Sequence, residues 1–226
     1  MADIQLPSLL GIDYKGHEMA NVINGIFPGN LQPSTTVAGC IDIFENAWPH
    51  PDKTIKMIEN EIENNSDVFW TKAGTVLEGS NQTYRTNKII NVTEGAMNEN
   101  NPVLQNIHNQ FAMLLYATSI PYAQKHHINE TLYHEGYAML KYYHNEQYKR
   151  HYDGGTGIGR VISAVCYLNN DYEGGEIEFT AHKIKIKPEP GMLILFPSNF
   201  AYAHIAHPIK SGIKYALVTW IKDRQL

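Results

Sequence analysis

Hydrophobic side chains in the first half of the chain recur every three or four residues, the spacing of a helix with one buried face. Ile55, Ile58 and Ile62 share one face of the segment from Asp52 to Asn64, and acidic side chains occupy much of the rest. This pattern predicts an amphipathic helix over that segment. Asp52 would be its N-cap, because a carboxylate accepts hydrogen bonds from the first backbone amides of a helix.

A second helical segment opens at Asn101, where a capping residue precedes a proline at the first helical position. The apolar positions of this segment are Leu104, Ile107, Phe111, Leu114 and Thr118. Pro121 should end or kink the helix, because proline donates no backbone hydrogen bond.

The segments around these two helices are less regular. A polar leader containing glycine and proline runs to about Thr36, and we assign it no function. An extended segment from Val37 to Phe44 follows. Between the helices, Gly74 to Asn100 is polar and favours a hairpin or a mobile loop. A lid over a pocket is one alternative for this segment, but a solvated loop is the more common one.

From Tyr137 onward, the pattern is that of consecutive strands. The turns between them fall at Gly154-Gly155, Asn169 to Gly175, Pro188 to Gly191 and Ser211-Gly212. This spacing is typical of a jelly roll. We therefore predict a mainly β fold with flanking helices, a cupin-like double-stranded β-helix in which the two helices cover the outer face of one sheet.

Length and composition favour a single domain. With 226 residues, of which 43% are hydrophobic and 18% charged, the chain is long enough to bury roughly 70% of its unfolded surface. We expect residues 1–36 to form the leader, residues 37–136 a helical support and hairpin region, and residues 137–226 the jelly-roll core.

Charge and hydropathy argue against several classes of partner. The net charge is −5 and the lysines and arginines are scattered, which argues against nucleic-acid binding. The most apolar later run, Met192 to Phe196, is far too short to span a bilayer. The N-terminus has no secretory pattern, so Cys40 and Cys166 are expected to stay reduced. We expect a soluble, cytoplasmic protein, and the sequence indicates no oligomeric state.

Three short His-x-Asp/Glu patterns are candidate metal sites, although chance produces such patterns freely. They are His50/Asp52, His144/Glu146 and His151/Asp153. The first pair is interleaved with prolines ahead of a helix, and the second lies in a predicted turn. The third pair ends a predicted strand, where side chains two apart point to the same face and can bind one metal ion.

A third ligand is expected from the run Tyr202 to Pro208, which contains His204 and His207. Three apart on a strand, these imidazoles face opposite ways, so only one of them can reach an interior metal. The strand is expected to end at Pro208, beside His207, and we therefore favour His204. Two histidines and one carboxylate with open positions are the ligand set of non-haem Fe(II) oxygenases.

Three longer segments carry further motifs in a fixed order. They are LKYYHNEQYKRHYDGG, GRVISAVCYLNNDYEGGEIEF and PGMLILFPSNFAYAHIAHPIKSGIKYALVTWI. They contain the metal pair, a Tyr-Leu-Asn strand end, a Gly-Gly-Glu turn and a His-x-x-x-Pro-Ile-x-x-Gly-x-Lys ending. From roughly Ala138 to Ile221, the chain resembles the catalytic region of the prolyl 4-hydroxylase-like family of Fe(II)/2-oxoglutarate dioxygenases.

The resemblance implies roles for particular side chains. The family's iron ligands fall on His151, Asp153 and His204. Lys214 falls on the basic residue that binds the distal carboxylate of 2-oxoglutarate. Tyr142 and Tyr167 match tyrosines that donate a hydrogen bond to the same cosubstrate in different branches of the family. Ile177 stands where collagen-type enzymes tend to have a threonine, so Tyr167 would take over that contact.

Strand parity and charge support the assignment of Lys214 to the cosubstrate independently of the resemblance. One face of the last strand carries Lys214, Ala216, Val218 and Trp220. The lysine and the tryptophan are therefore expected in the same cavity. There the lysine would offset the second carboxylate of 2-oxoglutarate, which leaves no buried charge unpaired. The alternative is a solvated lysine at a strand start, which the spacing behind His204 disfavours.

Tyr148, Arg160 and Trp220 match positions that line the substrate side of the pocket in the family. Each has a structural alternative, since aromatic residues on late strands are most often core. Arg160 and Tyr167 have opposite parity on one regular strand. Both can point inward only if Arg160 precedes the strand proper or a bulge intervenes.

The resemblance implies an enzyme that hydroxylates a C–H bond with Fe(II), 2-oxoglutarate and O₂, and that releases succinate and CO₂. Ascorbate is a candidate reductant. The expected substrate is a peptidyl proline, and the alternative substrates are a free amino acid or another small molecule. A competing interpretation is a non-enzymatic jelly-roll module whose His/Asp cluster holds a structural metal or none. Neither a membrane nor a nucleic acid is an expected partner.

Overall fold

The computed structural model describes residues 31–74, 84–97, 101–128, 132–155 and 158–223. Most of the leader expected for residues 1–36 lies outside the described residues, as does part of the polar segment that follows Gly74. The division of the chain into leader, support region and core therefore stays a prediction.

Helices and strands follow one another in an order that leaves most strands in the second half. The helices are α2 (Pro51–Asn64), α3 (Val92–Met97), α4 (Pro102–Lys125) and the short 3-10 helix η1 (Phe200–Tyr202). The first five strands are β1 (Thr35–Val37), β2 (Ile41–Phe44), β3 (Thr71–Lys72), β4 (Lys88–Asn91) and β5 (Leu132–His134). The next five are β6 (Ala138–Tyr142), β7 (Tyr148–His151), β8 (Arg160–Tyr167), β9 (Glu173–Gly174) and β10 (Ile177–Phe179). The last five are β11 (Ile184–Ile186), β12 (Leu193–Pro197), β13 (His204–Ala206), β14 (Ile209–Ser211) and β15 (Lys214–Asp223).

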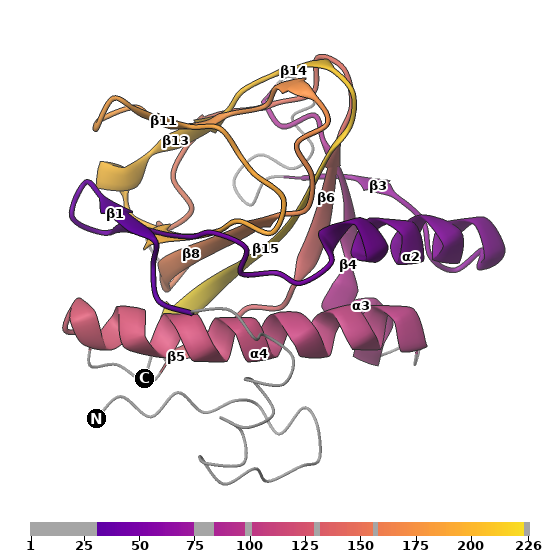
Figure 1. Ribbon diagram of the computed structural model, residues 1–226, viewed down its shortest axis with the longest axis horizontal. Helices are drawn as coiled ribbons and strands as arrows, with labels where there is room; N and C mark the ends of the chain where they lie inside the picture. Colours follow the sequence, from indigo (N-terminus) through magenta and orange to yellow (C-terminus); the bar gives the residue numbers. More distant parts are fainter. Residues whose placement is uncertain (1–30, 75–83, 98–100, 129–131, 156–157, 224–226) are drawn as a thin grey trace, which may run out of the picture.

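The strands form two main sheets that face each other, as Figure 1 shows. The large sheet has nine strands, in the order β1-β2-β12-β8-β15-β6-β4-β3, with β5 paired to β15. The smaller sheet has four strands, in the order β11-β10-β13-β7, and a further pair joins β14 to β9. The neighbours within both sheets are antiparallel. The predicted mainly β jelly roll is confirmed.

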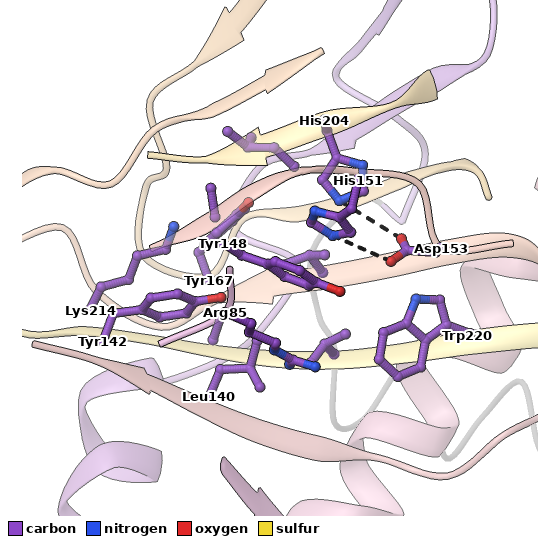
Figure 2. A pocket seen from close by; sticks show the side chains of 15 residues that line it. Arg85, Leu140, Tyr142, Tyr148, His151, Asp153, Tyr167, His204, Lys214 and Trp220 are labelled. Atoms are coloured by element: carbon purple, nitrogen blue, oxygen red, sulfur yellow. Dashed lines mark ion pairs between the residues drawn. The ribbon is translucent and has the colours of Figure 1, made fainter. Parts of the chain in front are cut away.

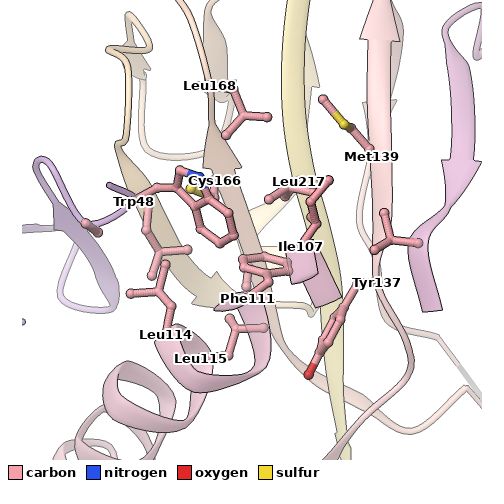
Figure 3. Packing of buried hydrophobic residues seen from close by; sticks show 14 of the residues in the cluster. Trp48, Ile107, Phe111, Leu114, Leu115, Tyr137, Met139, Cys166, Leu168 and Leu217 are labelled. Carbon is pink, nitrogen blue, oxygen red and sulfur yellow. The ribbon is translucent and has the colours of Figure 1, made fainter. Parts of the chain in front are cut away.

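The helices cover the outer face of the large sheet, as the sequence predicted. Figure 1 shows α4 running along this face, on the side away from β11 and β13. Asn101 caps α4, because its side-chain oxygen accepts hydrogen bonds from the amides of Val103 and Leu104 at 3.0 Å. The apolar face of α4 packs with β8 and β15 in one buried cluster (Figure 3). This packing fixes the large sheet from outside and leaves its inner face to the pocket.

The predicted cap of the first helix is wrong, and of the two alternatives for Pro121, an end or a kink, the end is contradicted and the kink stays a prediction. α2 begins after His50, whose backbone has a left-handed φ of 50°, and no side chain caps it. Asp52 lies within the first turn, where its charge still complements the helix dipole. α4 does not end at Pro121 but continues to Lys125. Pro121 is exposed, so water can take up the carbonyl group that the proline leaves unpaired.

The segment expected to be extended from Val37 to Phe44 is a hairpin instead. β1 and β2 pair antiparallel, and the turn between them contains Ala38 and Gly39 with φ values of 47° and 75°. In the polar segment after Gly74, β4 pairs antiparallel with β3 and β6. The described part of that segment thus favours the hairpin alternative and adds one strand to the large sheet.

The described residues include no helix that is both long and apolar enough to cross a membrane. The expected cytoplasmic location stays a prediction.

Candidate metal centre

The last strand, β15, separates two environments. Tyr215, Leu217 and Ile221 pack with the helices in the large apolar cluster. The alternate residues Lys214, Ala216, Val218 and Trp220 line a pocket between the two sheets. The predicted strand parity is confirmed, and it brings the lysine and the tryptophan into one cavity.

Three potential ligands meet in this pocket. His151 ends β7 and His204 begins β13, and the two residues are direct partners in the pairing of these strands. Nε2 of His151 lies 3.6 Å from Oδ1 of Asp153, and Nε2 of His204 lies 3.8 Å from Oδ2. One ligand atom from each residue lies within 4.8 Å of the other two. Figure 2 shows the three side chains converging, as a common metal ion requires.

His207 does not belong to this group. Its Nε2 lies 2.7 Å from a carboxylate oxygen of Glu178, and neither residue lines the pocket. The choice of His204 over His207, made from strand alternation, agrees with this geometry.

Backbone carbonyl groups orient both imidazoles. Nδ1 of His151 lies 2.7 Å from the carbonyl oxygen of Lys149, and Nδ1 of His204 lies 3.1 Å from that of Tyr202. With the proton on Nδ1, each ring directs the lone pair of Nε2 to the other ligands. Burial and the neighbouring His204 lower the pKa of His151 to about 3, so this ring is neutral near pH 7. A neutral imidazole is the form that binds a metal.

The carboxylate of Asp153 is held by a hydroxyl group. Ser163 donates a hydrogen bond of 2.6 Å to Oδ2, and the Ser163 oxygen lies 2.8 Å from that of Ser198. Burial alone would raise the pKa of Asp153. His204, His151 and the Ser163 hydroxyl outweigh burial and hold this pKa below its usual value. The residues thus supply two imidazole nitrogen ligands and one anionic oxygen ligand, a set that fits Fe(II).

Lys214 lies on the other side of the same pocket and is only 2% exposed. Its ammonium group donates to the carbonyl oxygen of Gly175 at 2.6 Å and lies over the rings of Tyr167 and Tyr142 at 4.9 and 5.4 Å. No described carboxylate lies within 4.0 Å of it. Burial lowers the pKa of Lys214 to about 7, against the opposing effect of Glu176. This cation lacks an anion, which one carboxylate of 2-oxoglutarate would supply.

The two tyrosines assigned to the cosubstrate both lie in the pocket near Lys214 (Figure 2). Burial raises the pKa of Tyr142 to about 12 and that of Tyr167 well above its usual value. Both hydroxyl groups are therefore protonated and able to donate. The geometry does not choose between them, and their roles stay predictions.

The three residues assigned to the substrate side lie toward the mouth. Tyr148 stacks on the ring of His151, with centroids 3.4 Å apart and planes inclined by 14°. Arg160 lies over the ring of Trp220 at 3.7 Å and donates to Glu135 at 2.8 Å. The pairing of β8 with β15 shifts register beside Arg160. Arg160 and Tyr167 have opposite strand parity, and an irregularity of this kind was needed for both to point inward. Arg160 lines the mouth and not the inner pocket.

Arg85 also lines the pocket, and the sequence had given it no role beyond a polar loop. It forms an isolated bridge with Tyr148, and its guanidinium lies over that ring at 4.8 Å. The contact joins segments far apart in the sequence, so no local spacing could have indicated it.

Known proteins match this segment of the chain. A family model described as the 2OG-Fe(II) oxygenase superfamily matches residues 137–222. A putative prolyl 4-hydroxylase from Acanthamoeba polyphaga mimivirus is 26% identical over 111 residues, which are 40% of this chain and 46% of that protein. The match therefore spans about half the length of that curated relative.

Solved structures share the fold over most of the chain. A prolyl hydroxylase from Trichoplax adhaerens, in complex with a peptide fragment of the hypoxia inducible factor oxygen degradation domain, has a TM-score of 0.69. It is 16% identical, with 96% of both chains covered. The viral collagen prolyl hydroxylase from Paramecium bursaria Chlorella virus-1, in a 2-oxoglutarate complex, has a TM-score of 0.57 at 20% identity, covering 81% of this chain and 96% of that one. The jelly-roll region, residues 137–222, thus matches the 2OG-Fe(II) oxygenase superfamily, and the His-Asp-His cluster lies within the matched residues.

Proposed function

We propose that the chain is an Fe(II)/2-oxoglutarate-dependent dioxygenase that hydroxylates a peptidyl proline and releases succinate and CO₂. One observation carries the proposal. A single pocket contains two imidazoles and a carboxylate that converge, and it also contains a buried ammonium group without an anion. A jelly roll with only a structural metal would give no reason to bury Lys214 in the same cavity.

The pocket has two charged sites, one for the metal ion and one for the cosubstrate. His151, Asp153 and His204 would hold the iron, and Lys214 would bind the distal carboxylate of 2-oxoglutarate with help from a tyrosine hydroxyl. Bound iron and cosubstrate supply the activation of O₂ and the oxidation of the C–H bond, which no side chain can perform. The chain itself orients the two groups and keeps water away through a mostly apolar wall. That wall includes Leu140, Val165, Ile177, Ala206, Ala216 and Val218.

A peptide substrate is supported by the relatives. The mimivirus protein is named a putative prolyl 4-hydroxylase, and the Trichoplax structure contains a bound peptide fragment. In this chain, the pocket adjoins a wider mouth with the aromatic side chains of Tyr84, Tyr148, Tyr152 and Trp220. Aromatic surfaces of this kind bind apolar rings such as that of proline.

The proposal is tested by product analysis. The protein is incubated with Fe(II), 2-oxoglutarate, ascorbate and ¹⁸O₂, together with a panel of proline-containing peptides or free amino acids. We expect one ¹⁸O atom in a peptidyl proline, detected by mass spectrometry, and none with Asp153→Ala. Product from free amino acids alone would remove the peptidyl-proline assignment. Omitting ascorbate from the same assay tests its role as reductant.

A further inference from the structure

Arg85 is a second buried cation in the pocket. It is 9% exposed, and it lines both the inner pocket and the mouth. Its Nε donates to Oδ1 of Asn87 and its Nη1 donates to the carbonyl oxygen of Gly74, both at 3.0 Å. A guanidinium has five N–H donors, so three of them have no acceptor among the described residues. Figure 2 shows the side chain of Arg85 extending into the pocket beside Tyr148.

No carboxylate compensates Arg85. No described Asp or Glu lies within 4.0 Å of its guanidinium. The other inward-lying arginine at the mouth, Arg160, forms an ion pair with Glu135. Arg150, also at the mouth, is exposed to solvent and donates to the hydroxyl of Thr180. Arg85 is therefore the buried arginine of this region that lacks a counter-charge.

The net charge of the pocket with Fe(II) and 2-oxoglutarate bound also points to Arg85. Fe(II) and doubly negative 2-oxoglutarate cancel each other, and Asp153 cancels one of the two side-chain cations. Because imidazoles bind a metal ion as neutral ligands, one positive charge remains among the lining residues. An uncompensated charge in an apolar cavity costs several kcal/mol, by rough estimate. A ligand that brings one negative charge would remove that cost.

We propose that Arg85 binds a carboxylate of the substrate, so that the enzyme selects substrates with an acidic group close to the carbon that is oxidised. This inference rests on the proposed function and deepens it by naming the substrate class. The remaining N–H groups, one on Nη1 and two on Nη2, can form a two-pronged hydrogen bond with a carboxylate, the geometry for which arginine is suited. The carboxylate would belong either to a chain-terminal proline or to an acidic side chain of the peptide.

The position of Arg85 agrees with this role. Figure 2 shows the ring of Tyr148 between Arg85 and His151; the guanidinium lies 4.8 Å from its centroid, and the imidazole stacks on it at 3.4 Å. A substrate carboxylate bound to Arg85 would thus lie one aromatic ring away from a metal ligand. The bonds to Gly74 and Asn87 hold the guanidinium in place before the substrate arrives, which reduces the entropy lost on binding.

The test compares acids with their amides as ligands. The protein is loaded with Mn(II), which accepts the same ligand types as Fe(II), and with 2-oxoglutarate. Binding is measured by NMR from the broadening that Mn(II) causes in ligand signals. The first pair is N-acetyl-L-proline and its amide, and the second is Ac-Ala-Pro-Asp-Ala-NH₂ and the same peptide with Asn. The two pairs distinguish a carboxylate on the reacting molecule from one on a flanking side chain.

We expect at least one acid to bind about tenfold or more tightly than its amide, as charge-assisted hydrogen bonds would give. Arg85→Gln should abolish this preference. Arg85→Lys keeps the positive charge but loses the planar guanidinium, so it should retain part of the preference for the acid. This variant also provides the test if Arg85→Gln does not fold. Arg150→Gln is the matched control, because it removes an exposed arginine at the same mouth, and it should leave the preference unchanged.

Equal binding of acid and amide in both pairs, or no binding by any of the four ligands, would overturn the inference. The same holds for a preference that survives Arg85→Gln. The proposed function is tested separately. The wild-type protein with Fe(II) and 2-oxoglutarate under nitrogen should show a weak charge-transfer band in its visible spectrum. A band without a carboxylate preference contradicts only the role of Arg85, whereas absence of the band contradicts both proposals.

Discussion

The two faces of the large sheet carry opposite chemistry although they are built from the same strands. On the face toward the helices, Leu217 of β15 and Cys166 of β8 are fully buried in an apolar cluster (Figure 3). On the face toward the smaller sheet, their neighbours Lys214, Tyr167 and Ser163 carry ammonium and hydroxyl groups. Strand alternation alone separates the two sets.

The difference lies in what completes each face. The helix face is completed by the chain itself, since α4 fills it with aliphatic and aromatic side chains. The pocket that the other face lines contains two buried cations, Lys214 and Arg85, without described counter-ions. Substitutions on the first face should therefore change the free energy of unfolding, whereas substitutions on the second should change ligand binding.

The largest effect is expected for Lys214→Met. Removing one partner of a buried charge pair costs about 2–5 kcal/mol, so the affinity for 2-oxoglutarate should fall about 30-fold or more. The folded ligand-free protein should not be weakened, because the variant no longer buries an unpaired ammonium group. Calorimetric titration of the Mn(II)-loaded protein measures the affinity. Unchanged affinity would contradict the role of Lys214.

On the helix face, Leu217→Ala should lower the free energy of unfolding by about 3 kcal/mol, since it opens a cavity in a close-packed cluster. Val218→Ala on the pocket face is the matched control and should cost roughly 1 kcal/mol, because it only enlarges an existing cavity. Urea denaturation measures both values. Equal losses for the two variants would show that the faces do not differ as described.

Within the pocket face, Ser163→Ala should weaken metal binding about 10- to 100-fold, the usual effect of removing a partner that orients a ligand. The control is Ser198→Ala, since Ser198 contacts Ser163 but has no hydrogen bond to the carboxylate. We expect a smaller loss for that variant. Mn(II) titration followed by electron paramagnetic resonance gives the two affinities, and the account fails here if Ser198→Ala has the larger effect.

The smallest predicted effect is a pH dependence. The pKa of Lys214 in the ligand-free protein is lowered to about 7 by burial, whereas the bound carboxylate requires the protonated lysine. Affinity for 2-oxoglutarate should thus be flat below pH 7 and fall above it, by at most tenfold per pH unit. Titrations between pH 6 and 8.5 test the slope.

Lys214→Arg separates this effect from other titrating groups. A guanidinium stays charged over this pH range, so any affinity that the variant retains should not fall above pH 7. The same slope in both proteins would assign the pH dependence to another group.

Much of the fold and the metal cluster could be predicted because both depend on local periodicity. Lys214 and Trp220 share strand parity on β15, and His151 ends β7 with Asp153 two residues further on, in the bend that follows the strand. The choice between His204 and His207 followed from the same rule. These features need no knowledge of distant contacts.

The remaining features depend on contacts that no local pattern records. Arg85 enters the pocket through its pairing with Tyr148, and Arg160 reaches the mouth through a register shift against β15. Pro121 stays within α4 because the helix places it at the surface, which its own residue type does not reveal. The His50 cap depends on a left-handed backbone that histidine rarely adopts.

The central claim is that His151, Asp153 and His204 bind one iron ion in the pocket that also holds 2-oxoglutarate. The most direct test adds Fe(II) and 2-oxoglutarate to the protein without oxygen and records the visible spectrum. We predict a weak charge-transfer band in the wild-type protein and no band in Asp153→Ala, with unchanged folding by circular dichroism. A band of equal strength in the variant, or none in the wild type, would contradict the claim.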